Sequence, residues 1–293
     1  MKPATHDDRQ CYNRSARRLV RGVATSDGAG VNLTRLIGGR ELGMLDPFLL
    51  LDHFDSDKPD DYIAGFPPHP HRGFETVTYM LAGRMRHRDN AGHEGVIENG
   101  GVQWMTAARG IIHSEMPEQE EGLMSGLQLW VNLPSHKKMA APEYHEYNAE
   151  MIAVEHRDHA CSIAVIAGRT SLGTMGPVTG RAVNPLYLDI SLEGNGSFIE
   201  PIPISYNAFI YVLEGKITVL GERNEQDAVV EKGDLAILDH GHRVQIISEP
   251  PTARFILVAG EPLNESVARR GPFVMNTDAE LRQAFKDYSK GEF

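Results

Sequence analysis

The sequence contains little cysteine, has fewer basic than acidic residues and has no long apolar run. Cys11 and Cys161 are the two cysteines among 293 residues, too few for a disulfide framework or a cysteine-rich zinc site. We therefore expect two unpaired thiols in a reducing compartment. Lys and Arg number 29 against 40 Asp and Glu, and the formal net charge of -11 at pH 7 argues against the backbone of a nucleic acid as a direct partner.

One short segment departs from this acidic balance. Arg14, Arg17, Arg18 and Arg21 make the region locally basic, and we interpret it as a solvated arm. No apolar run approaches the roughly 18 residues that a membrane span needs. The first residues, MKPATHDDRQCYNRSARR, are polar and charged and contain no apolar stretch like that of a secretory signal. We expect a cytoplasmic protein without a membrane partner.

Short β-type runs separated by glycine and proline make up most of the chain. The 29 glycines and 17 prolines punctuate segments rich in Val, Ile, Leu, Thr, Tyr and Phe, a pattern typical of sandwiches or barrels. We expect strands at Val31–Ile37, Phe74–Leu81, Val102–Thr106, Gly126–Leu133, Ser162–Ala167, Phe209–Leu213, Lys216–Leu220 and Phe255–Val258. The predicted fold class is all-β, and 293 residues with 41% hydrophobic side chains allow two domains.

One helix is expected near the carboxyl end. Thr277 and Glu280 have the spacing of a capping box, which satisfies free N–H groups at the start of a helix. The apolar residues that follow recur at helical spacing: Leu281, Ala284, Phe285 and Tyr288. We expect this short helix to pack as a terminal clasp.

Two stretches of the sequence recur at nearly the same spacing. TYMLAGRM resembles IYVLEGKI, with residue 78 aligned to residue 210, an offset of 132. VIENGGVQWM resembles VVEKGDLAIL, with residue 100 aligned to residue 233, an offset of 133. The match predicts a duplicated β-domain with a boundary in or soon after the loop Met139–Asn148. We place the domains at residues 1–145 and 146–293.

The stretch GFPPHPHRGFETVTYML places two histidines one residue apart in a β-prone region. Residues i and i+2 of a strand share a face, so His69 and His71 direct both imidazoles to one side. In ARGIIHSEMPE, His113 and Glu115 have the same relation. On facing strands of one barrel the two pairs would supply three imidazoles and a carboxylate. Such a donor set suits iron, manganese, nickel, copper or zinc and leaves positions open for water, oxygen or substrate.

Chance produces some of these pairs, because the sequence has 13 histidines. His240 and His242 form such a pair, which we interpret as part of a turn, and a solvated acid is the alternative for Glu115. The duplication provides a control, since the two offsets map the four candidate ligands onto Pro201, Pro203, Ile246 and Ser248. We therefore expect one metal site, in the first half, and a metal-free second domain with a structural or regulatory role.

Three motifs, FPPHPHRGFETVTYML, GGVQWMTAARGIIHSEMP and GLQLWVNLP, resemble those of the pirin family of bicupins, and the likeness extends through most of the chain. The resemblance implies two cupin, or jelly-roll, β-barrels face to face, with one iron-type metal in the amino-terminal barrel. The implied metal ligands are His69, His71, His113 and Glu115. The implied cofactor is one divalent ion, Fe(II), with Mn, Ni, Cu, Co and Zn left open.

Residues around the first motif have separate interpretations. The general cupin pattern would use Glu75 as a ligand, whereas the pirin-like pattern uses Glu115, so we assign Glu75 a supporting or strand-pairing role. Arg72 follows the histidine pair and is expected to point to the opposite face, where a surface or loop-anchoring role and a catalytic role are equal alternatives. The segment 66–68 is expected to line the mouth of the site.

The resemblance implies two functions. Bacterial pirin-like proteins act as quercetin 2,3-dioxygenases, which open the flavonol ring with O2 and release carbon monoxide. Glu115 would then be catalytic and take the proton of the flavonol 3-hydroxyl. Eukaryotic pirins are described as nuclear, iron-dependent coregulators, so the alternative is a redox-sensing protein that acts through protein partners. A sugar-isomerase or storage-type cupin is a third reading, because one fold hosts many chemistries. We expect the enzyme, with a flavonol and O2 as its partners.

Overall fold

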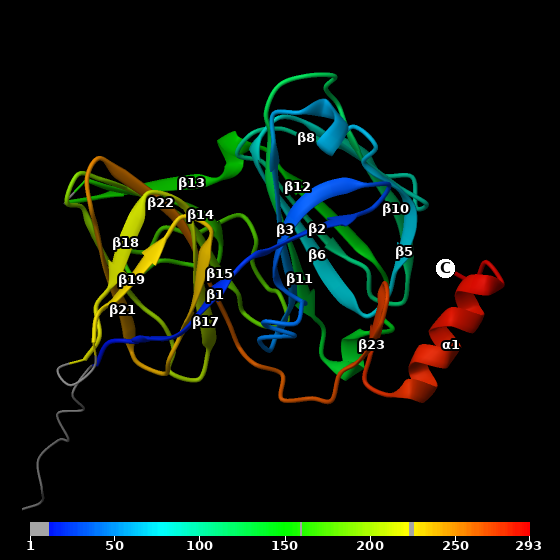
Figure 1. Cartoon of the computed structure of the whole chain (residues 1–293). Coiled ribbons are helices and arrows are strands. Elements are labelled where there is room, and N and C mark those ends of the chain that lie inside the picture. The colour runs from blue at the N-terminus through cyan, green and yellow to red at the C-terminus, as the bar shows by residue number, and fades with distance from the viewer. Residues whose placement is uncertain (1–11, 159, 223–225) are drawn as a thin grey trace, which may run out of the picture.

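The computed structural model describes residues 12–158, 160–222 and 226–293, and Figure 1 shows a molecule built mainly of β-strands. In spatial order, the large sheet of the first half contains β12 (Glu143–Tyr147), β9 (Val102–Thr106), β6 (Phe74–Ala82), β11 (Met124–Asn132), β4 (Phe48–Ser56), β3 (Val31–Ile37) and β2 (Val23–Asp27). Its small sheet contains β5 (Phe66–His71), β10 (Ile111–Pro117), β7 (Met85–Asp89) and β8 (Glu94–Ile97).

The second half has a large and a small sheet of the same kind. The large sheet contains β1 (Ala16–Arg21), β20 (Asp234–Leu238), β17 (Asn207–Glu214), β22 (Thr252–Gly260), β15 (Leu186–Glu193), β14 (Cys161–Ala167) and β13 (Ala153–Arg157). The small sheet contains β16 (Ser197–Pro201), β21 (Arg243–Ser248), β18 (Lys216–Val219) and β19 (Ala228–Glu231). The remaining elements are β23 (Ala268–Arg270), β24 (Phe273–Met275), the helix α1 (Asp278–Ser289), and the 3-10 turns Pro59–Asp61, Ser135–Lys137 and Ala149–Met151.

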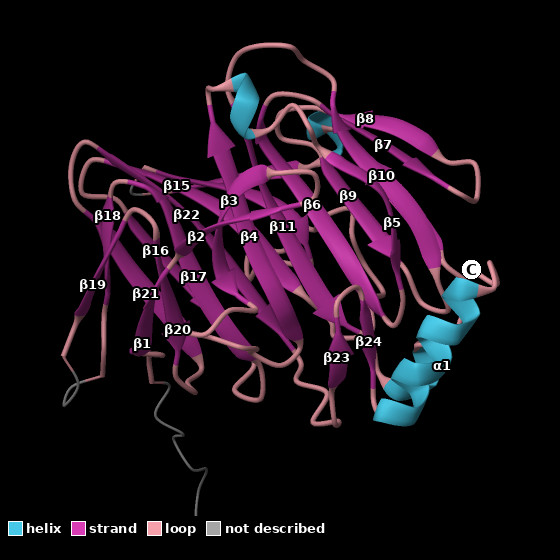
Figure 2. Cartoon of the chain, turned by 45° about the vertical axis from the view of Figure 1, so that its right-hand side comes forward, coloured by secondary structure: helices cyan, strands magenta, loops and turns pink. Residues whose placement is uncertain are grey.

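The two halves repeat one topology, which confirms the all-β class and the duplication. The order β5-β10-β7-β8 in the first small sheet corresponds to β16-β21-β18-β19 in the second, and β9-β6-β11-β4-β3-β2 corresponds to β20-β17-β22-β15-β14-β13. Each half is a sandwich of two separate sheets rather than a closed barrel. Figure 2 shows the two sandwiches side by side.

One edge strand crosses between the halves. β1 comes from the start of the described chain but pairs with β20 of the second half, and Figure 1 shows this blue strand among strands of the second half. β12 contains residues 145 and 146 and pairs with β9 of the first half. β1 and β12 therefore occupy equivalent edges of the two large sheets. The division at residues 145 and 146 stays a prediction.

The expectation of a solvated basic arm is wrong for Arg14. Its side chain is fully buried, and its guanidinium donates hydrogen bonds to the carbonyls of Gly241 at 3.0 Å, Tyr206 at 2.9 Å and Pro203 at 2.7 Å. Burial lowers the pKa of Arg14 to about 10. The guanidinium supplies donors to several loop carbonyls at once. Arg14 therefore anchors the chain to the second half.

The two large sheets face each other across an apolar interface. The rings of Phe48 and Phe209 meet there edge to face, with centroids 5.3 Å apart. A buried polar contact accompanies them: the hydroxyl of Tyr79 donates to Asp189 at 2.6 Å, and Arg254 also binds Asp189. One continuous cluster of buried residues spans both sheets, as a shared core requires. The expected face-to-face arrangement is confirmed.

The interiors of the two sandwiches differ. In the second half a cluster of 23 buried residues, including Phe198, Ile246 and Phe255, fills the space between the sheets. The corresponding cluster of the first half, which includes Leu33, Phe54 and Met80, has eight buried members. The first half also buries histidines and a glutamate in its interior. A polar site therefore has room in the first half, while the second interior is a packed core.

The C-terminal segment returns to the first half. Arg72 donates to Pro272 O and accepts from Val274 N, which joins the β23–β24 hairpin to the end of β5. The buried Arg72 guanidinium also donates to Asp287 of α1 at 2.6 Å. Thr277 begins the helix with the predicted capping box. The expected clasp and the loop-anchoring role of Arg72 are both confirmed.

Two smaller findings concern the sequence as a whole. Cys161 is a buried, free thiol, whereas Cys11 lies outside the described residues. In the described part of the chain, no helix is both long and apolar enough to cross a bilayer.

Candidate metal centre

The His-Pro-His stretch forms β5 at the edge of the small sheet, which explains its prolines. A proline has no N–H to donate, so it is tolerated where one side of a strand has no partner. β5 pairs on one side with β10, where His69 lies opposite His113 and His71 lies opposite Ile111. The expectation of facing strands is therefore wrong, because the two histidine-bearing strands are hydrogen-bonded neighbours. A register shift after His113 places Glu115 opposite Phe66.

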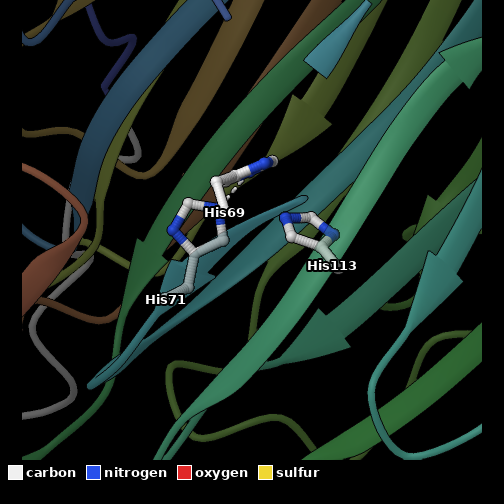
Figure 3. A group of neighbouring side chains, drawn as sticks. All are labelled: His69, His71 and His113. Atoms are coloured by element: carbon white, nitrogen blue, oxygen red, sulfur yellow. Dashed lines mark hydrogen bonds between the residues drawn. The ribbon is translucent and has the colours of Figure 1, made fainter. Parts of the chain in front are cut away.

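Three imidazoles gather on the inner face of these strands. Nε2 of His69 lies 3.0 Å from Nε2 of His71, and the ring centroid of His113 lies 4.3 Å from that of His69 and 4.8 Å from that of His71. Figure 3 shows the group. Their candidate ligand atoms lie within 4.8 Å of one another. His71 and His113 are 4% and 1% exposed, whereas His69 lies nearer the surface.

Hydrogen bonds leave nitrogen lone pairs available in this group. Nδ1 of His69 lies 2.9 Å from the carbonyl of Pro67, so this nitrogen carries the proton and Nε2 is free to bind a cation. Nε2 of His113 is buried and has no partner in the described chain. Burial, followed by repulsion between the rings, lowers the pKa of His71 and His113 well below the usual range. The two are therefore neutral, the state in which histidine binds metals, and the group fits a divalent cation.

Glu115 approaches the same interior and is held from the opposite wall. Its side chain is 3% exposed, and Oε1 accepts hydrogen bonds from Thr78 Oγ1 at 2.9 Å and Gln128 Nε2 at 3.0 Å. Thr78 belongs to β6 and Gln128 to β11, both in the large sheet. Within residues 12–158, 160–222 and 226–293, Oε2 has only the longer contact of 3.2 Å to Gln128. The carboxylate is thus fixed by neutral donors and keeps one oxygen largely available.

A fourth buried imidazole, not selected from the sequence, adjoins the group. His87 on β7 lies opposite Glu115 and is fully buried, with Nδ1 3.3 Å from Nδ1 of His113. His87, His113 and Glu115 form a second potential metal-ligating group that shares His113 with the first. Burial lowers the pKa of His87. The signal was alternation along MRHRD, where Met85, His87 and Asp89 point inward.

A pocket of about 590 Å³ opens onto His69, His71 and Glu115. Aromatic side chains form part of its wall: Phe54, Phe66 and Trp130. The segment 66–68 lines it, so that expectation is confirmed. The volume lies in the range of small-molecule sites, and the mixture of apolar walls with a few polar groups is typical of them.

The other residues considered from the sequence lie elsewhere. Glu75 is buried, accepts a hydrogen bond from Thr106 at 2.7 Å and lies 3.7 Å from Arg181 of the second half, outside both imidazole groups. His240 and His242 lie in the loop between β20 and β21, as expected for a turn. The mapped positions in the second half are the exposed Pro201 and Pro203 and the buried Ile246 and Ser248, none of which is a histidine.

The comparisons with known proteins agree with the two-sandwich architecture. A family model described as Pirin matches residues 30–131, and one described as Pirin C-terminal cupin domain matches residues 187–293. A Pirin-like protein of Caulobacter vibrioides is 50% identical, covering 96% of this chain and 99% of its own length. A Pseudomonas aeruginosa protein named "Putative quercetin 2,3-dioxygenase" is 48% identical, with 95% and 97% covered.

A solved structure gives the same result for the fold. The crystal structure of a quercetin 2,3-dioxygenase from Acinetobacter baumannii superposes with a TM-score of 0.86 at 32% identity, covering 96% of this chain and 98% of the other. The two sandwiches are therefore cupin domains, and the histidine-rich interior belongs to the first of them. With matches over most of both halves, the chain belongs to the pirin family.

Proposed function

We propose that this protein is a metal-dependent dioxygenase that opens the ring of a flavonol with O2 and releases carbon monoxide. The observation that carries the proposal is the gathering of three imidazoles beside a carboxylate, next to a pocket with aromatic walls that opens onto His69, His71 and Glu115. The names of the Pseudomonas relative and the Acinetobacter structure support the choice of substrate class.

His69, His71, His113 and Glu115 are the residues that would hold the metal, and Fe(II) is the proposed ion. The fit rests on the unpartnered Nε2 of His113 and on the close approach of the Nε2 atoms of His69 and His71. Bound there, the ion would act as a Lewis acid that stabilises the negative charge of the flavonol 3-oxygen and of the ring carbon open to attack. Oε1 of Glu115 is engaged by Thr78 and Gln128, so the carboxylate keeps one orientation.

The chain's own groups would bind the flavonol and accept its proton. Phe54, Phe66 and Trp130 offer aromatic surfaces on which flat rings stack. Oε2 of Glu115 is the oxygen with spare acceptor capacity, so it would take the proton of the 3-hydroxyl. We include a cytoplasmic location in the proposal, supported by the free thiol of Cys161.

The test is aerobic quercetin consumption with detection of carbon monoxide, using protein reconstituted with Fe(II). His69→Ala removes a proposed ligand and should abolish carbon monoxide release. His156→Ala is the matched control, because His156 is exposed on β13 of the second half. It should turn over at the native rate.

A lack of carbon monoxide from native protein with a full complement of metal would refute the dioxygenase proposal. The alternative of an iron-dependent, redox-sensing binding protein would then take its place. That protein would show partner binding that differs between Fe(II) and Fe(III) without any turnover.

A further inference from the structure

The pocket contains a cation that the dioxygenase proposal does not use. Arg269 lies on β23 of the C-terminal hairpin, and its side chain lines the pocket together with His71 and Trp130. The hairpin places it there, because Arg269 lies opposite Val274, whose N–H donates to the carbonyl of Arg72. Arg72 directly follows His71. The guanidinium is thus positioned by a hydrogen-bonded segment next to the candidate metal centre.

Trp130 connects the guanidinium to the imidazoles. The Cζ atom of Arg269 lies 4.8 Å from the ring centroid of Trp130, and that ring lies 5.1 Å from the ring of His71, centroid to centroid. A flat ligand beside Trp130 could therefore meet both groups at once. Because the pocket is about 590 Å³, one ligand of this class fits within it.

Among the described residues, no carboxylate pairs with the guanidinium of Arg269. Nη1 donates to the carbonyl of Leu49 at 2.9 Å, and in the described part of the chain its other N–H groups have no protein acceptor. Two of the three acids that line the pocket are committed to Arg35: Asp52 binds it through both oxygens, at 2.9 and 2.7 Å, and Asp27 binds it at 2.9 Å. The third, Glu115, accepts from Thr78 and Gln128. Burial, followed by repulsion from Arg35, lowers the pKa of Arg269. An added anion would offset the repulsion from Arg35.

We propose that Arg269 selects aromatic ligands that carry an oxyanion at one end and bind the candidate metal centre through oxygens at the other end. A carboxylate is the oxyanion used in the test. The inference rests on the proposed function, which supplies the ligand class, a flavonol. It adds that the preferred ligand bears a negative charge. A guanidinium presents a planar fork of donors that matches a carboxylate, and the interaction is strengthened in a partly buried pocket. Arg269 is thus a specificity-determining residue.

The experiment uses 3-hydroxyflavones with a carboxylate at position 4′ or position 7, each compared with its methyl ester. Dissociation constants are measured calorimetrically on the Fe(II)-loaded protein without oxygen, so that no turnover occurs. For at least one position, we expect the acid to bind about ten-fold more tightly than its ester. Arg269→Gln should bring acid and ester within two-fold, and Arg269→Lys should keep part of the preference.

Arg270→Gln is the matched control, because Arg270 is the exposed neighbour on the same strand and does not line the pocket. It should keep the native preference, and all variants should contain the native amount of iron. Equal affinities for acid and ester at both positions would overturn the inference, as would a preference that survives Arg269→Gln.

The outcomes separate this inference from the proposed function. Release of carbon monoxide without any preference for the acids would refute the inference and leave the dioxygenase intact. Preference for an acid without carbon monoxide would support the inference and refute the dioxygenase. Failure of all four compounds to bind would refute the inference.

Discussion

The substitution Glu115→Gln tests the central residue of the proposed reaction with little structural disturbance. In the native protein Oε1 accepts from Thr78 and from Gln128. The variant replaces one carboxylate oxygen with an NH2 group, which would face the Nε2 donor of Gln128. A flip of the Gln128 amide turns its oxygen toward the new donor. The flip loses the 3.3 Å contact from Thr78 to Gln128 and the donation from Gln128 Nε2 to residue 115. The net cost to stability is about 1 kcal/mol.

The expected effect on turnover is much larger. A positioned general base contributes a factor of about 10² to 10⁴, so we expect carbon monoxide formation to fall by this amount. His69, His71 and His113 remain, and we therefore expect metal affinity to fall less than turnover does. Three measurements are compared: metal content by elemental analysis, metal affinity by chelator competition, and carbon monoxide release under saturating quercetin.

The matched control is Glu118→Gln, which makes the same chemical change outside the pocket. Glu118 forms an ion pair with Arg86 at the protein surface, where such pairs contribute little to stability. It should retain native turnover. Native turnover in metal-loaded Glu115→Gln would refute the base role. A loss of turnover that merely follows the loss of metal would leave Glu115 as a ligand alone.

Three further predictions follow from buried side chains. His87→Gln should lower Fe(II) affinity about 10- to 100-fold in chelator competition, because His87 orients His113; unchanged affinity would contradict this role. Burial lowers the pKa of His53 to about 4, so the unfolded chain binds a proton that the folded protein excludes, and stability should fall as the pH drops from about 6.5 to about 4. His53→Gln should reduce this pH-dependent fall in the free energy of unfolding, measured with urea, by up to about 3 kcal/mol. The same pH dependence in variant and native protein would rule out His53 as the source of the fall. Asp287→Asn removes the charge facing the buried guanidinium of Arg72 and should cost about 1–3 kcal/mol in urea unfolding at pH 7; native stability would show that the ion pair holds no part of the helix in place.

Local patterns predicted much of the fold correctly. The capping box at Thr277, the β-type runs and the recurring motifs at offsets of 132 and 133 all correspond to elements of the structure. The pair spacing also identified His69 and His71 as sharing a face, and the structure brings both together with His113. These features depend on neighbours in the chain or on similarity between two segments, and both can be read without knowing what packs against them.

Other residues could not be identified in this way. His87 has a local signal in the alternation along MRHRD, but only the strand pairing places it opposite Glu115 and beside His113. Arg14 was expected in solvent, but loop carbonyls of the second half surround its guanidinium. Arg269 is about 200 residues from the histidine pair in the sequence, and only the return of the C-terminal hairpin brings it to the pocket.

The sequence by itself determined the two β-rich halves, the terminal helix and the pairs of side chains that share one strand face. Tertiary structure alone decided that the sheets stay open, that β1 joins the second half, and that the two histidine-bearing strands are hydrogen-bonded neighbours. The physical reason is that strand alternation is set by local backbone geometry. Contacts between residues far apart in the chain decide which partner each edge strand takes. They also decide which cationic side chains line one pocket.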